Sequence, residues 1–389
     1  MLKKINPLAI WVILFAIAST VLLQSDFRSS SNDSKFYTYL VGQLYQQPAA
    51  QWIAPKWGDN YWGHPPDMYI RDHLVGNIIG GVILARMGLN ENHALHVLQM
   101  LYQVLSLLLL YSIAAQFMAK SQASTLMWTL LLIPVAFTYS IRANHEQGMM
   151  FFNLLAVYSS VRLVGSGGWF VGVVIGAIGT FLIKGFPFVL VIPMCLVAFY
   201  IAYIHKHSCG FKKLIANREV IYKSIGMGVL PLMGVVLVAY IYEQLYTRAT
   251  GLEFFSEYWR VQIMERSVEI AAKHSFIVQK LSNFKYYVLR TIYYSAPWSL
   301  AVIGVLIAQR KKLNSVVVSP TFLLFLCTGL VYIFAFSVFD RTASRYIFPT
   351  FYLFSAAMVV FLWENSPRFR KIHRQIETQR AFQVAAWIW

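Results

Sequence analysis

The sequence predicts an all-α protein that crosses a membrane about ten times. Of its 389 residues, 58% are hydrophobic and only 13% are charged, a balance that excludes an ordinary soluble domain. Apolar runs of about 20 residues, the length that crosses a bilayer as a helix, recur between short basic clusters. The expected spans are residues 7–24, 94–118, 123–141, 147–163, 169–183, 186–204, 224–246, 291–309, 316–338 and 346–363.

The basic clusters set the expected topology. The formal net charge of +17 does not indicate nucleic acid, because the Lys and Arg residues lie in short connections, as they do in cytoplasmic loops of membrane proteins. One short, glycine-rich apolar segment, residues 74–89, is ambiguous. If it does not cross, the clusters at residues 206–223 and 310–312 fall on the same side as Lys3 and Lys4. We therefore expect an interfacial or re-entrant helix at 74–89 and both termini in the cytoplasm.

This topology gives one membrane domain, residues 1–363, and a short basic cytoplasmic tail, residues 364–389. It places two long polar stretches, residues 24–93 and 247–290, on the outer face, where we expect them to cover a site. Most of the other unusual polar residues fall on the same face. The three cysteines have no metal-ligand spacing and predict no disulfide framework.

The first outer stretch contains a candidate acid–base residue. Residues 24–73 hold five of the 16 acidic residues, among many aromatic side chains. Asp33 directly precedes apolar residues at helical spacing, such as Phe36, Tyr37 and Leu40, which predict an amphipathic helix on the membrane surface. Asp33 fits the cap of that helix, and it also fits a carboxylate held at the bilayer surface as a general base. The two roles are compatible.

Residues 142–146 (RANHE) form a second polar group, between two spans. Arg142 and Glu146 have the four-residue spacing of an ion pair at a helix start. A carboxylate at a membrane boundary with Arg142 and His145 beside it also fits a second active-site acid. His64, in a rigid His-Pro-Pro turn, is a candidate phosphate contact, metal ligand or proton carrier.

Cations also occur on the outer face, where the topology rule gives no reason for them. Lys184, followed by Gly185, interrupts a long apolar run. It fits a snorkelling side chain at a tight turn or a point charge for a lipid phosphate. Arg341, Arg345 and Tyr346 open the last span. Arginine suits phosphate because it can donate two parallel hydrogen bonds, and an Arg/Tyr pair is also an ordinary interfacial anchor.

Taken in order, these motifs resemble the GT-C superfamily of multi-spanning glycosyltransferases that use polyprenyl-phosphate sugars. The nearest resemblance is to protein O-mannosyltransferases and to the lipid A aminoarabinose transferase. The shared features are an acid after the first span, a His-Pro-Pro turn, an acid before a Phe-rich span, a Lys-Gly turn and an Arg-Tyr-x-x-Pro opening of a late span. Two residues depart from the pattern: Ser34 stands where many members carry a second acid, and His64 where the aminoarabinose branch has lysine.

The resemblance implies transfer of a sugar from a polyprenyl-phosphate donor to a glycan, lipid or protein acceptor, at the periplasmic face of a bacterial inner membrane. Asp33 would be the catalytic base, and Glu146 would orient a substrate or share a divalent metal with it; the sequence itself requires no cofactor. An O-antigen ligase or polymerase and a non-enzymatic flippase of lipid-linked saccharides are the alternatives. The residues expected to contact substrate are His64, Arg142, His145, Lys184, Arg341, Arg345 and Tyr346.

Overall fold

A computed structural model of the chain describes residues 32–58, 63–140, 142–210, 214, 216–264, 276–310, 316–339 and 342–378. Throughout this part the regular structure is helical, and an isolated antiparallel bridge pairs Lys56 with Tyr69. The predicted all-α class is therefore confirmed for these residues. The expected first span, residues 7–24, lies outside them.

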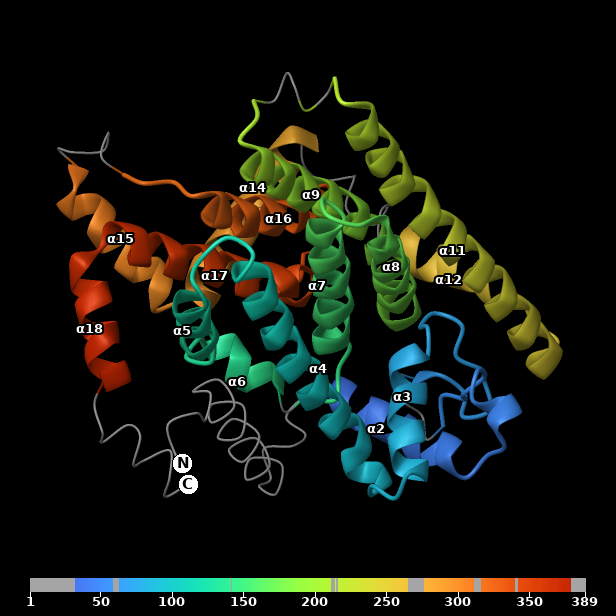
Figure 1. Cartoon of the computed structure of the whole chain (residues 1–389). Coiled ribbons are helices and arrows are strands. Elements are labelled where there is room, and N and C mark those ends of the chain that lie inside the picture. The colour runs from blue at the N-terminus through green and yellow to red at the C-terminus, as the bar shows by residue number, and fades with distance from the viewer. Residues whose placement is uncertain are drawn as a thin grey trace, which may run out of the picture.

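Long apolar helices form the body of the protein (Figure 1). Their buried side chains make two main clusters, one centred on α7, α16 and α17 and the other on α2, α3, α8 and α11. The packed helices are α4 (Glu91–Ala114), α7 (Glu146–Arg162), α8 (Phe170–Lys184), α9 (Val191–His207), α11 (Arg218–Thr250), α16 (Pro320–Ser337) and α17 (Phe348–Asn365). Short 3-10 or π turns are η2 (Ala49–Gln51), η4 (Gly167–Trp169), η5 (Phe186–Leu190), η6 (Arg260–Met264) and η8 (Ser344–Ile347).

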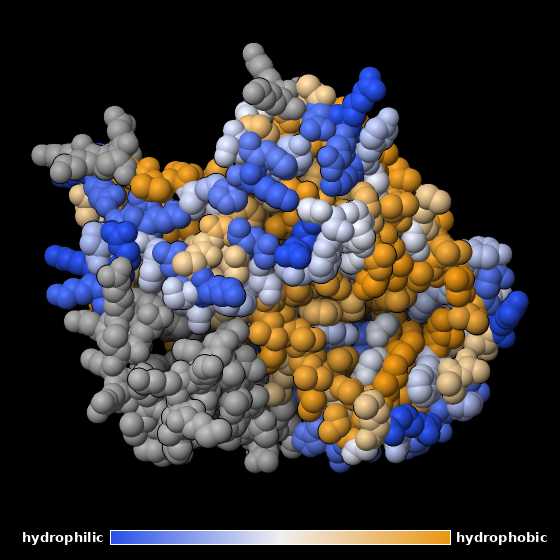
Figure 2. All heavy atoms as spheres, viewed as in Figure 1, coloured by the Kyte–Doolittle hydropathy of each residue, from blue (hydrophilic) through white to orange (hydrophobic). Residues whose placement is uncertain are grey.

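The outer surface of α11 is apolar. Leu232, Met233, Val236 and Leu237 are all exposed on this helix. Figure 2 shows hydrophobic side chains gathered over the region of α8 and α11, with hydrophilic residues toward the top and bottom of the view. An apolar band between polar ends is the surface expected of a membrane protein. The band lies against the lipid tails, and the polar ends lie in the headgroup region and in water.

Six helices of the described part are long and apolar enough to cross a membrane. A seventh span arises if the bent pair α14 (Phe276–Tyr294) and α15 (Trp298–Ala308) is counted as one. The membrane class is thus supported, and the expected count of ten spans is not confirmed. The last helix, α18 (Pro367–Thr378), lies in the expected tail.

Two of the expected spans are interrupted, in both cases near a proline. Residues 123–141 form two short helices, α5 (Lys120–Leu130) and α6 (Pro134–Ser140), in place of one span. Residues 291–309 contain the end of α14 and the whole of α15, which meet at a bend of 97° with Pro297 between them. Proline has no N–H to donate and clashes with the carbonyl four residues earlier, so a helix does not continue through it unstrained.

The amphipathic helix expected after Asp33 is present as α2 (Asn32–Tyr45). Its apolar positions Phe36, Leu40, Val41 and Leu44 are fully buried, and they pack against α3 and α4. The ambiguous segment at residues 74–89 contains α3 (Gly76–Arg86), whose 11 residues rise only about 16 Å. That length is too short to cross a bilayer core of about 30 Å. This agrees with the charge pattern, which requires that the segment does not cross.

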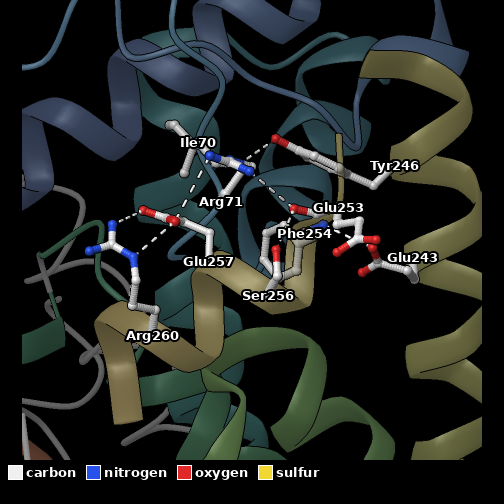
Figure 3. Close-up of polar contacts among 9 residues, drawn as sticks. All are labelled: Ile70, Arg71, Glu243, Tyr246, Glu253, Phe254, Ser256, Glu257 and Arg260. Carbon is white, nitrogen blue, oxygen red and sulfur yellow. Dashed lines mark hydrogen bonds and ion pairs between the residues drawn. The ribbon is translucent and has the colours of Figure 1, made fainter. Parts of the chain in front are cut away.

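A short helix from the second polar stretch, α12 (Phe254–Trp259), is fixed by polar contacts on two sides (Figure 3). Glu243 of α11 accepts hydrogen bonds from the backbone N–H groups of Phe254 and Phe255, at 2.9 and 3.0 Å. Arg71 of the first polar stretch donates to the carbonyl of Glu253 at 3.3 Å, and its guanidinium lies 3.9 Å from the Glu257 carboxylate. The two stretches that were expected to cover one site are therefore joined.

Tyr258 connects α12 to the turn after α8. Its hydroxyl accepts a hydrogen bond from the backbone N–H of Phe186 at 3.1 Å. The close approach depends on Gly185, whose φ is +73°, because a β-carbon there would lie 1.8 Å from the Tyr258 hydroxyl. Glycine tolerates both the positive φ and the contact. Lys184, the last residue of α8, is held by this arrangement.

We predict that Gly185→Ala destabilises the protein more than Gly251→Ala. Both glycines have a positive φ, but nothing lies within 4 Å of a β-carbon at Gly251. The control should lose about 1–2 kcal/mol through backbone strain, and Gly185→Ala should lose about 1–3 kcal/mol more through overpacking against Tyr258. Thermal unfolding of the purified variants in detergent measures the difference. Equal losses would mean that Tyr258 does not press on this turn.

Candidate functional site

One cavity of about 490 Å³ gathers most of the residues singled out in the sequence. It is bounded by the start of α2, the loop before α3, the start of α7, the turn after α8, Tyr258 of α12, and the end of α16 with η8. Seven of the nine predicted site residues line it, and they come from segments far apart in the chain: Asp33, His64, His145, Glu146, Lys184, Arg345 and Tyr346.

The other two predicted residues are not part of this wall as described. The Arg142 guanidinium lies over the ring of Tyr139, 4.7 Å from its centroid, and Arg142 does not line the cavity. Arg341 lies outside the residues that the structure describes. The geometry therefore offers Lys184 and Arg345 as the cations of the cavity, and it gives Arg142 a stacking contact.

Asp33 and Arg345 form an ion pair across the cavity. Asp33 lies in the first turn of α2, and Arg345 lies in η8 before the last long helix. Their side chains are 28% and 41% exposed, so the pair remains open to solvent and to a ligand. Asp33 is therefore more than a helix-start residue, because its carboxylate faces a cation from the other end of the chain.

Glu146 and Lys184 form a second and more deeply buried pair. Lys184 Nζ donates to Glu146 Oε1 at 3.3 Å, and the two side chains are 17% and 3% exposed, respectively. Breaking such a pair costs about 3–5 kcal/mol, because the remaining charge is left buried without compensation. The pair therefore holds the start of α7 against the end of α8.

A chain of buried amide and hydroxyl groups positions residues 142–146. The Ser34 hydroxyl donates to the Asn144 side-chain oxygen at 3.1 Å, and the Asn77 amide donates to the Asn144 carbonyl at 2.8 Å. Gln99 of α4 in turn donates to the Asn77 side-chain oxygen at 2.9 Å. Ser34 thus links α2 to the segment that carries His145.

His145 is buried beside this chain. Its ring meets the Tyr37 ring edge-on at 4.4 Å between centroids, and neither ring nitrogen has a hydrogen-bond partner among the described residues. Burial lowers the pKa of His145 well below its ordinary value, and the charges of Lys184 and His73 act in the same direction. The imidazole is therefore neutral at pH 7, with one N–H donor and one acceptor nitrogen.

Aromatic stacking positions His64 at the cavity wall. Its ring stacks on Trp57 at 4.1 Å between centroids, and Trp57 stacks on Phe36 of α2 at 5.2 Å. Tyr346 also lines the wall and stacks on Phe336 of α16, at 5.5 Å between centroids. The cavity thus combines two ion pairs with flat aromatic surfaces.

The sequence reasoning missed an Asp–His pair in the same cavity. His73 Nδ1 lies 2.9 Å from Asp72 Oδ1, and both residues line the wall. Burial opposes ionisation of Asp72, but His73, a backbone hydrogen bond and His64 together outweigh that effect, so the pKa of the Asp72 carboxyl is lowered. Adjacent acid and imidazole residues in a loop rich in carboxylates were the available signal. Tyr258 was missed too, because no local sequence pattern indicates that it lines the cavity.

Metal ligation finds no support in the described residues. No group of three or more His, Cys, Asp or Glu side chains within them is placed to hold a metal ion. The carboxylates of Asp33 and Glu146 instead have Arg345 and Lys184 as partners.

Comparison with known proteins bears on the family and the fold of the chain. The family model of dolichyl-phosphate-mannose-protein mannosyltransferases matches residues 82–218. No match to the chain is found among curated proteins. The fold is similar to that of ArnT from Cupriavidus metallidurans bound to undecaprenyl phosphate, with a TM-score of 0.66, 14% identity, and coverage of 93% of this chain and 62% of ArnT.

The apo structure of the same ArnT gives a TM-score of 0.63 at 15% identity, covering 95% of this chain and 62% of ArnT. The chain thus spans less than two thirds of the length of the solved structures it resembles. At these identities the likeness concerns the fold. The resemblance that the motifs predict is confirmed to this extent: part of the chain matches a mannosyltransferase family model, and its fold is similar to that of ArnT.

Proposed function

We propose that the chain is a membrane glycosyltransferase that moves a sugar from a polyprenyl-phosphate carrier to an acceptor at the outer, periplasmic face. The observation that carries the proposal is the single cavity in which two carboxylates each face a cation, Asp33 with Arg345 and Glu146 with Lys184. The GT-C fold supports the same reaction class. The distribution of basic clusters along the sequence supports the outer side.

The size of the cavity suits the polar part of such a donor. A volume of about 490 Å³ lies in the usual range for small-molecule sites and accommodates a monosaccharide with its phosphate. A polyprenyl chain does not fit and would remain in the bilayer. The apolar wall formed by Phe336, Phe339 and Tyr346 offers it an exit beside Arg345.

In the proposed reaction the donor phosphate binds Lys184 and Arg345, the two cations of the cavity. Both form ion pairs with carboxylates. Phosphate would replace Asp33 as the partner of Arg345, and Lys184, whose ammonium group has three donors, would contact the phosphate while it keeps Glu146. The Asp33 carboxylate is then free to accept a proton. Charged hydrogen bonds of this kind contribute about 1.5–3 kcal/mol each.

Transfer then needs one proton acceptor and stabilisation of one leaving group. Asp33 accepts the proton of an acceptor hydroxyl or amine as that group bonds to the anomeric carbon. The anomeric C–O bond breaks, its electron pair leaves with the polyprenyl phosphate, and Lys184 and Arg345 stabilise the charge that develops there. Glu146 orients the sugar or the acceptor, and His64 and Tyr346 supply contacts from the wall.

Asp33→Asn should lower sugar transfer at least about 100-fold, because it keeps the shape of the side chain and removes the base. Asp67→Asn is the matched control. It lies in the same stretch, its side chain is 98% exposed, and Lys56 lies 3.7 Å away. Transfer of radiolabelled sugar in membranes with equal protein content measures both variants. Near-normal transfer by Asp33→Asn would move the base to another residue.

Lys184→Ala and Arg345→Ala should each weaken use of the lipid-linked donor about tenfold or more. The double variant should lose less than the product of the two, because both residues act on one phosphate. Arg86→Ala is the control, since Arg86 donates to the carbonyl of Gln47 and does not line the cavity. Thermal unfolding checks the fold of Lys184→Ala, which leaves Glu146 unpaired. Independent, multiplicative losses would contradict a shared phosphate.

A further inference from the structure

Two consecutive residues at the start of α7 present unsatisfied polar atoms to the cavity. His145 and Glu146 are 6% and 2% exposed, and both line the cavity wall. Three of their atoms, the two ring nitrogens of His145 and Oε2 of Glu146, have no hydrogen-bond partner in the described part of the chain. Buried polar groups are nearly always paired in folded proteins, so three in one place indicate a ligand that completes them.

The backbone beneath these side chains is fixed independently of any ligand. Asn77 and Ser34 hold Asn144 from α3 and α2. Lys184 occupies Oε1 of Glu146 and leaves Oε2 for another donor. The unpaired atoms are therefore presented on a rigid support, as a recognition site requires.

The chemistry of the three atoms selects the ligand group. A neutral imidazole offers one donor and one acceptor, and Glu146 Oε2 only accepts. Hydroxyl groups satisfy all three atoms, because each hydroxyl both donates and accepts. An ionised phosphate cannot donate to Oε2 or to the acceptor nitrogen. An ammonium group cannot accept from the ring N–H, and it would lie near the Lys184 cation.

The position of the pair points to the sugar of the donor. Glu146 bonds to Lys184, the cation assigned to the donor phosphate, so its free oxygen lies beside the proposed phosphate position. Resting on the function proposed above, we infer that His145 and Glu146 form a subsite that binds hydroxyl groups of the donor sugar. The donor sugar then carries a hydroxyl, and not an amine or a phosphate, at the positions that face these two residues.

Binding to the purified full-length protein in detergent tests this without knowledge of the acceptor. The probes are undecaprenyl phosphate alone and undecaprenyl phosphate carrying mannose, glucose, galactose, arabinose or glucosamine. At least one lipid carrying a neutral sugar should bind about tenfold tighter than undecaprenyl phosphate, and glucosamine in place of glucose shows whether the 2-hydroxyl is among the groups bound. His145→Phe keeps the ring against Tyr37 and removes both nitrogens. It should abolish the gain from the sugar and leave binding of undecaprenyl phosphate unchanged.

Two controls keep the result specific. His145→Gln retains one donor and one acceptor and should retain most of the gain. His205→Phe changes an exposed histidine of α9, whose ring contacts Phe117 outside the cavity, and should change nothing. Analogues of the tightest-binding neutral donor, each lacking one hydroxyl of the sugar, locate the contact. For one analogue His145→Phe should cause no further loss of affinity, because that analogue already lacks the hydroxyl that His145 contacts.

The outcomes separate this inference from the proposed function. If neither undecaprenyl phosphate nor any sugar-loaded form binds, the polyprenyl-phosphate function fails. If undecaprenyl phosphate binds, but no attached sugar increases its affinity, the hydroxyl subsite is overturned. Equal losses for the bare and sugar-loaded lipids in His145→Phe would also overturn it, because they would show a structural effect on the whole site.

Discussion

The pairing of buried charge is the constraint on which the site depends. Glu146 is almost completely buried at the start of α7, and a carboxylate in that position is tolerated only with a partner. Lys184, at the end of α8, supplies it. Asp33 and Arg345 repeat the arrangement between α2 and the opening of α17. The two ion pairs thereby bring α2, α7, α8 and the start of α17 to one cavity. The apolar helices that pack behind these segments fix the distances between them.

This arrangement also explains how the cavity can contain several charges. Each carboxylate is neutralised by a cation, and in the proposed reaction Arg345 exchanges Asp33 for the incoming phosphate. The exchange makes a base available when the donor is bound. The cover contributed by α12 acts on the same group, because Tyr258 fixes the turn that follows Lys184. One short turn therefore connects α12 to Lys184, the cation that the proposal assigns to the phosphate.

Much of this site could be predicted because short stretches of sequence contain its charged residues and the apolar spacing of its helices. The spacing of Phe36, Leu40 and Leu44 indicates α2, and Lys184 and Arg345 stand out as cations where topology does not need them. The breaks in two expected spans have a visible cause in Pro134 and Pro297, which hydropathy alone overlooks. Other features have no local signature: Arg142 turns to stack on Tyr139, and Tyr258 reaches the cavity only through the contacts of α12 with α11 and Arg71.

The most direct test of the account is the identity of the donor. Purified protein is placed in vesicles that contain no polyprenyl phosphate of their own, with cell-envelope acceptors present. A radiolabelled sugar is then added either on undecaprenyl phosphate or on a nucleoside diphosphate. The account predicts that label reaches the acceptor from the lipid-linked sugar alone, and that undecaprenyl phosphate is released in equal amount. Transfer from the nucleotide sugar in those vesicles would contradict it, because the cation pair would then not serve a lipid phosphate.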